Sequence, residues 1–166
     1  MAVVVDTEVK NKIYKYKIPD YIKQRFWKDH APHLTKKEVD LIFKSFKDYI
    51  YLTQISNSYL SSFIVDEAWH TFILFTKDYE RFCLSTVGKF IHHSPSISIG
   101  GYKSDISDIE DTYKRMKKYL PDSKLYKMDK RMKIKGSKSK GIISLKKKKK
   151  KMIVFLDNKK IGKFNG

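Results

Sequence analysis

Positive charge is concentrated at one end of this chain, and this asymmetry limits how much of the chain can form a compact fold. Residues 130–166 contain 15 Lys and Arg against one acid, a net charge of +14 (15 − 1), whereas residues 1–129 contain 21 against 17, a net charge of +4 (21 − 17). A lysine-rich segment repels itself and supplies few apolar side chains for a core. We therefore predict a folded domain over residues 1–129 and a basic tail over residues 130–166.

Two parts of the tail differ in character. Residues 133–151 combine lysine, serine and glycine, and we predict that they are disordered. Beyond them, two β-prone runs at residues 152–156 and 160–164 flank Asp157-Asn158, a pair typical of turns, which favours a small β-hairpin.

Apolar residues in the domain recur at helical spacing. Thr35 and Glu38 form the pattern of a capping box, which predicts a helix from residue 36 to about residue 51. Pro19 opens a helix that runs to about residue 28, and Pro121 ends another that spans residues 105–119. Within the helical segment 63–84, residues 65–75 are apolar nearly all round, and Thr76 is a second start signal. The fold class predicted is all-α: a compact bundle of four to five helices with a largely disordered basic tail.

The same spacing predicts which side chains are buried. Phe26 and Trp27 share an apolar face with Ile22 and are expected in the core. In the helix from residue 36 the opposite face is polar, so we expect it in solvent, and the residues from Thr53 to Ser62 should form a connection. The polar face comprises Asp40, Lys44, Lys47 and Asp48. His30 and His33 are expected at the surface.

Composition excludes several classes of protein. With 166 residues the chain is too short for a large multidomain assembly, and no run approaches the ~18 consecutive apolar residues of a membrane span, so we expect no membrane partner. A single cysteine, Cys83, rules out a disulfide within the chain and zinc fingers built on paired Cys-x-x-Cys ligands. A cytoplasmic location fits best. Glycine-rich phosphate loops and the G-x-S-x-G nucleophile turn are missing from the sequence.

One group of residues has the chemistry of a metal site. Asp66 or Glu67 can lie beside His70 on one helix face, because three or four positions make about one helical turn. Cys83 follows further along, and a turn at Gly88 can bring back one of two adjacent histidines. Such carboxylate, imidazole and thiolate ligands suit zinc or iron. The predicted ligands are Asp66, His70, Cys83, His92 and His93, with the choice between the last two left open.

Two other interpretations of this group remain. His70 could be hydrogen-bonded to Asp66 and Cys83 could be a small core residue, in which case the group only stabilises the fold. Alternatively, Cys83 could act as a nucleophile with His92 or His93 as its base. If the metal site is catalytic, hydrolysis by metal-activated water is the first reaction to test; the sequence itself leaves open whether the protein is an enzyme.

The same residues carry a family resemblance. The pattern resembles the short bacterial relatives of the plant glycine-rich-domain proteins, and it consists of residues 65–76, Tyr79, Phe82-Cys83, Gly88 and residues 90–95. The resemblance implies a helical fold and gives weight to the Trp69-His70 and His92-His93 pairs, without a settled biochemical activity. Plant members usually carry Trp-His-x-His, where Phe72 stands in the place of the second histidine here. The glycine-rich segment of the larger proteins is absent from this sequence, and the lysine tail departs from the family pattern.

The leading hypothesis is thus a small intracellular helical domain that holds one zinc or iron ion. The alternative is a nucleic-acid-binding module in which the tail and the helix face with Lys23, Arg25 and Lys28 contact phosphates without reading bases. Its binding residues would be Lys146, Lys147, Lys148, Lys149, Lys150 and Lys151. A third possibility is a module that binds another protein.

Overall fold

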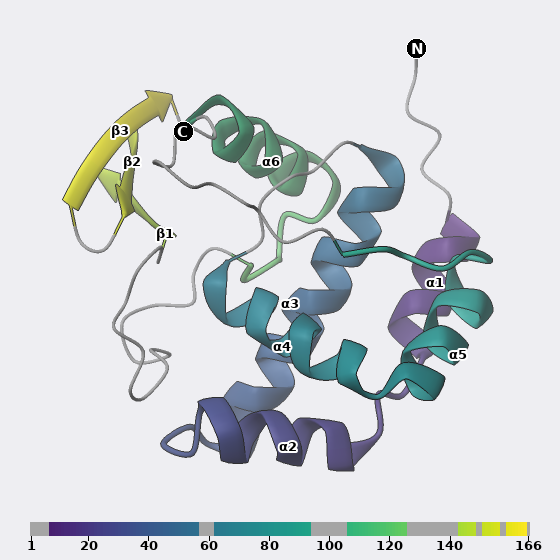
Figure 1. The fold of residues 1–166 in the computed structure, drawn as a ribbon. Coiled ribbons are helices and arrows are strands. Elements are labelled where there is room, and N and C mark those ends of the chain that lie inside the picture. Colours follow the sequence, from purple (N-terminus) through teal and green to yellow (C-terminus); the bar gives the residue numbers. More distant parts are fainter. Residues whose placement is uncertain are drawn as a thin grey trace.

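The computed structural model describes residues 7–56, 62–93, 106–125, 143–148, 151–156 and 159–165. Within these ranges the chain forms six helices followed by a three-stranded sheet (Figure 1). The helices are α1 (Thr7–Lys15), α2 (Asp20–His30), α3 (Lys36–Ile55), α4 (Phe63–Leu74), α5 (Thr76–Thr86) and α6 (Ile106–Tyr119). The strands are β1 (Ile143–Lys148), β2 (Lys151–Leu156) and β3 (Lys159–Asn165).

Helix α3 is the centre of the bundle, because it contacts α1, α2, α4 and α6. Helix α4 crosses α3 and also contacts α2 and α5, while α5 lies beside α1 (Figure 1). The predicted all-α bundle is confirmed for this part of the chain.

Aromatic side chains from three helices fill the core. The ring of Phe46 on α3 lies 6.1 Å from Trp69 and 5.9 Å from Phe72, both on α4, and 5.7 Å from Phe82 on α5. Phe46, Phe72 and Phe82 are completely buried. Because aromatic residues bury large apolar areas, these contacts fix how α3, α4 and α5 pack together.

Several local predictions are confirmed. Thr35 accepts a hydrogen bond from the Glu38 amide at 3.3 Å, and the Glu38 carboxylate accepts one from the Thr35 amide at 2.8 Å, which completes the capping box. The chain breaks at Phe75 and a new helix begins at Thr76, as the second start signal predicts. Gly88 ends α5 with a φ of +80°, a conformation that glycine adopts readily.

Other local predictions were wrong. Helix α1 was not predicted, since residues 12–18 alternate too briefly to indicate a structure. Helix α3 continues to Ile55, so residues 53–55 are helical rather than part of a connection; residues 57–61 of that connection lie outside the described residues.

The predicted polar face of α3 is only partly a solvent face: Lys44 is exposed, whereas Lys47 and Asp48 are covered. Asp48 is only 3% exposed, and its carboxylate accepts hydrogen bonds from Tyr14 and, at 2.6 Å, from Ser123. Lys47 is half-buried and donates to the Tyr14 and Tyr16 carbonyls at the end of α1. Burial lowers the pKa of Lys47, and the nearby charge of Lys23 acts in the same direction. The face covers α1 and the segment after α6, elements that the sequence pattern of α3 does not reveal.

Trp27 was also assigned wrongly. It is 44% exposed, whereas its neighbour Phe26 is buried. The Trp27 indole N–H donates to the Leu34 carbonyl at 2.8 Å, so this ring closes the turn after α2 from outside the core.

The tail contains an antiparallel sheet in the order β1-β2-β3. The predicted hairpin is confirmed as β2 and β3, but the prediction of disorder was wrong for residues 143–148 and for Lys151. In sequence, residues 143–146 alternate apolar and polar, and pairing with the β-prone β2 in full register explains why a lysine-rich segment becomes a strand. Strand β3 contacts α6 (Figure 1). Residues 126–142 lie outside the described residues.

Among the helices described above, none combines the length and the apolar character that crossing a lipid bilayer requires.

Candidate metal centre

The centre of the candidate site is Asp66, which lies in the first turn of α4. Its Oδ1 atom is 3.0 Å from Nε2 of His93, and its Oδ2 atom is 3.7 Å from Nε2 of His70. His70 is one turn further along the same helix, which is the spacing that the sequence indicated. The helix N-terminus stabilises a carboxylate at this position because the first amide groups carry partial positive charge.

His93 lies between two flat side chains. The centroid of its ring lies 4.2 Å from that of Trp69, with an interplanar angle of 26°. It lies 4.5 Å from the centroid of His70, with an interplanar angle of 12°. The His93 side chain is 11% exposed, Asp66 is 33% exposed and His70 is 42% exposed. His93 is therefore the fixed member of the group, and His70 faces solvent.

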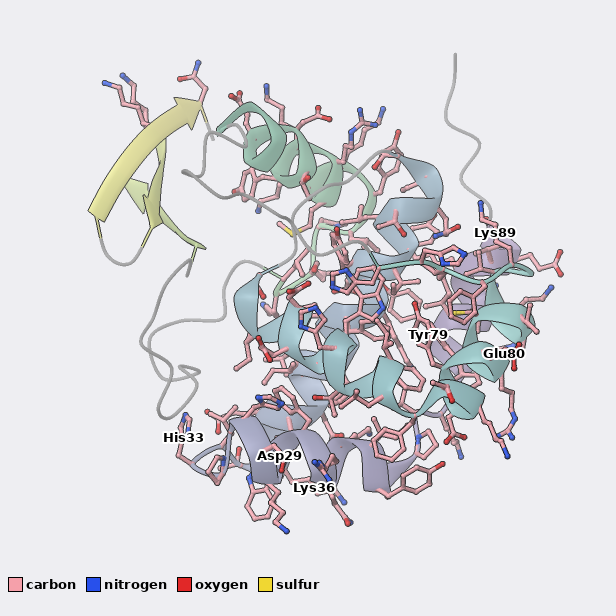
Figure 2. All side chains as sticks on the ribbon, viewed as in Figure 1. Asp29, His33, Lys36, Tyr79, Glu80 and Lys89 are labelled. Carbon is pink, nitrogen blue, oxygen red and sulfur yellow. The ribbon has the colours of Figure 1, made fainter. Side chains whose placement is uncertain are left out.

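Ile91 anchors the extended segment that carries His93. The hydroxyl of Tyr79 on α5 donates to the Ile91 carbonyl at 2.6 Å and accepts from the Trp69 indole N–H at 2.9 Å. Figure 2 shows Tyr79 inside the domain, whereas its neighbour Glu80 points outward. Burial raises the pKa of Tyr79, so the phenol stays protonated and remains a donor at neutral pH.

Cys83 contributes to the same anchor. Burial raises the pKa of the Cys83 thiol, while the polar groups of the nearby Ile91 backbone and Tyr79 side chain act in the opposite direction. The thiol is completely buried. A raised pKa disfavours the thiolate, which is the form needed both for attack on a substrate and for metal binding.

The structure thus brings together three of the five predicted ligands. Within the described ranges, the group of His, Cys, Asp and Glu residues able to share an ion is Asp66, His70 and His93, whose ligand atoms all lie within 4.8 Å of one another. Cys83 lies outside this group because it faces the Ile91 backbone. His92 lies outside it as well: its side chain is exposed and packs against Phe90, with ring centroids 5.0 Å apart.

Sequence reasoning missed a second carboxylate and histidine pair next to this group. Glu67 does not pair with His70; its Oε2 atom lies 3.6 Å from Nδ1 of His30, the last residue of α2. His30 is half-buried rather than a surface residue. A helix C-terminus favours a histidine cation, and this preference was the available signal in the sequence.

Buried Tyr49 on α3 lies near the group. Burial raises its pKa, and the negative charge of Asp66 raises it further. Its ring also packs against Trp69, with centroids 5.8 Å apart.

The predicted nucleic-acid-binding lysines fall mainly in the sheet. Lys146, Lys147 and Lys148 belong to β1, and Lys151 begins β2 with an exposed side chain. Lys149 and Lys150 lie outside the described residues. Lys163 on β3 is exposed as well.

Fold and site together define a small helical domain in which a carboxylate and a histidine of α4 meet a second histidine from the segment after α5. The family model described as UCP032817-like matches residues 8–137, and the chain belongs to this family. The matched range includes Asp66, His70 and His93 and ends before β1. No curated protein and no solved structure matches the chain.

Proposed function

We propose that this protein binds one zinc or ferrous iron ion through Asp66, His70 and His93. The observation that carries the proposal is the approach of one carboxylate oxygen and two imidazole nitrogens to within 4.8 Å of one another. Two histidines and one carboxylate are a ligand set used by both metals, and three protein ligands leave a position open for water. If the protein is an enzyme, metal-assisted hydrolysis is the reaction class that such a position supports.

Binding requires two local changes. An imidazole binds a metal through a lone pair in the plane of its ring, and the rings of His70 and His93 are within 12° of parallel, so these lone pairs do not converge. His70 has to turn, which its exposure allows. His93 can bind an ion through Nε2 only as the tautomer that carries its proton on Nδ1, so the ion would take the place of the Nε2 contact with Asp66.

The proposal is tested on protein purified without a metal-affinity tag. Elemental analysis, followed by titration of the metal-free protein with zinc and with cobalt as a visible probe, should give about one ion per chain. His93→Ala and Asp66→Asn should abolish this binding, because each removes a ligand. His92→Ala is the matched control and should keep it, because the exposed His92 does not belong to the group of three ligands. A native and a reconstituted protein that both lack metal would end the proposal.

The resemblance to relatives of the plant glycine-rich-domain proteins is a further part of this proposal. Its support is that Trp69, His70 and His93, which belong to the shared pattern, lie against one another. An experimental structure of a plant member in which the matching tryptophan and histidines lie far apart would contradict it.

Nucleic-acid binding by the tail is the second candidate. The exposed side chains of Lys151 and Lys163 on neighbouring strands favour it. Changing the six lysines of residues 146–151 to glutamine should weaken binding of a DNA or RNA oligonucleotide and flatten its salt dependence, because each phosphate contact releases counterions. The control changes six exposed lysines of the helical domain to glutamine and so removes the same charge: Lys15, Lys17, Lys36, Lys37, Lys77 and Lys89. Equal losses in both proteins would indicate that the net charge, rather than the tail, is responsible.

A further inference from the structure

The segment that carries His93 needs an external support. Residues 90–93 belong to neither a helix nor a strand, so no ladder of backbone hydrogen bonds fixes their position. His93 nevertheless reaches Asp66 at 3.0 Å with most of its side chain buried. Contacts with side chains outside the segment must therefore fix its position relative to α4.

The hydroxyl of Tyr79 provides that support on two sides. It donates to the Ile91 carbonyl, which holds the segment two residues before His93. It also accepts from Trp69, whose ring is the surface on which His93 stacks. One oxygen atom therefore fixes both the segment that carries His93 and the Trp69 ring on which His93 stacks. The Tyr79 ring itself packs against Phe72 and Phe90, with centroids 5.4 and 5.3 Å apart.

We propose that Tyr79 is a positioning residue of the metal site, whose hydroxyl sets the place of His93 over Asp66 through Ile91 and Trp69. The part of this inference that concerns metal affinity rests on the proposed function. Tyr79 does not contact the ion; it acts through the two residues that its hydroxyl joins.

Tyr79→Phe tests the proposal, because it removes the hydroxyl and keeps the ring. Zinc affinity of the full chain should fall about 10- to 100-fold, the usual effect of removing a group that orients a ligand. In the metal-free protein, the NMR signals of the His93 ring protons should lose the shift caused by stacking between Trp69 and His70. This second measurement does not depend on whether any metal binds.

Tyr16→Phe is the matched control. The Tyr16 hydroxyl donates to the Asp78 carbonyl at 3.5 Å, and its ring packs on Phe82, so the change is chemically the same but has no link to Ile91. It should lower the melting temperature and leave both zinc affinity and the His93 signals unchanged. Cys83→Ala, which removes the other contact to Ile91, should keep the His93 signals and change zinc affinity by less than about threefold.

The outcomes separate the two proposals. A wild type that binds no metal, with His93 signals that move in Tyr79→Phe, would end the metal proposal and support the positioning role. Unchanged His93 signals in Tyr79→Phe would overturn the positioning role, whether or not zinc affinity falls. A Cys83→Ala protein in which the His93 signals lose the stacking shift would show that the thiol supports the segment, and it would overturn the positioning role of Tyr79. This test can be made even if Tyr79→Phe does not fold.

Discussion

The buried carboxylate of Asp48 gives the sharpest test of how the helices are held together. It joins α1 to α3 through Tyr14 and joins α3 to the segment after α6 through Ser123. Tyr14→Phe removes one donor and leaves no cavity, because the ring remains. A hydrogen bond to a charged group contributes about 1.5–3 kcal/mol. In a protein of this size 1 kcal/mol corresponds to about 2–4 °C. We therefore expect the melting temperature to fall by about 3–12 °C.

The loss should depend on pH. Burial raises the pKa of Asp48, and the hydrogen bonds from Ser123 and Tyr14 oppose that rise. For a group whose pKa is raised in the folded state, the stabilising contribution is complete below the unfolded pKa and is lost as the pH rises through the folded pKa. The ionised carboxylate therefore needs the Tyr14 donor most at neutral pH, and the cost of Tyr14→Phe should shrink as the pH falls toward 4.

The assay is thermal and urea unfolding of the wild type and two variants at several pH values. Tyr21→Phe is the control: its hydroxyl donates to an Asp78 oxygen at 2.6 Å, but the side chain is 51% exposed and water can replace the lost bond. Its effect should be far smaller than that of Tyr14→Phe. Equal effects of the two variants, or a cost of Tyr14→Phe that grows toward acid pH, would refute the argument that burial of Asp48 makes its hydrogen bonds costly to lose.

Three further predictions concern single side chains. Thr35→Ala should destabilise the protein by about 1 kcal/mol in urea unfolding through loss of the capping box, whereas Ser62→Ala should cost nothing, because the buried Ser62 hydroxyl has no hydrogen-bond partner among the described residues; a reversed order would contradict this. Cys83 should react with iodoacetamide in native protein far more slowly than in unfolded protein, since its thiol is buried and its pKa is raised; a native rate equal to that of a free thiol would place it at the surface. Phe46→Ala should cost about 3–5 kcal/mol, measured by urea unfolding, through the cavity left between three helices; a loss below about 1 kcal/mol would mean that the core collapses around the gap.

Short-range signals predicted the helices whose stability is local. Thr35 and Glu38 satisfy each other's backbone groups, and Gly88 adopts the φ that ends α5, so both boundaries follow from the sequence alone. Helix α1 does not, because its nine residues bury only Ile13 and depend on partners in α3. Lys47 caps the carbonyls at its end, a long-range contact that no window of sequence around α1 contains.

The tail shows that short-range signals can also predict disorder where the chain is ordered. Composition predicted disorder for residues 133–151 because the segment has too few apolar residues to bury a core. Strand β1 takes its partners from β2, where residues 152–156 add a run of apolar residues to the two apolar residues of β1. Pairing between segments, which composition does not measure, decides the structure of such a chain.

The candidate site was predictable only as far as helical spacing reaches. Asp66 and His70 are four positions apart on α4, so their proximity follows from geometry. The choice between His92 and His93 depends on which side of an extended segment faces α4, and a shift of one residue reverses it. That choice is made by the hydrogen bond that fixes Ile91, and this bond comes from Tyr79 on α5 rather than from the segment itself. Tyr79 also accepts from Trp69 on α4, the ring on which His93 stacks, so contacts between elements distant in sequence decide which histidine reaches Asp66.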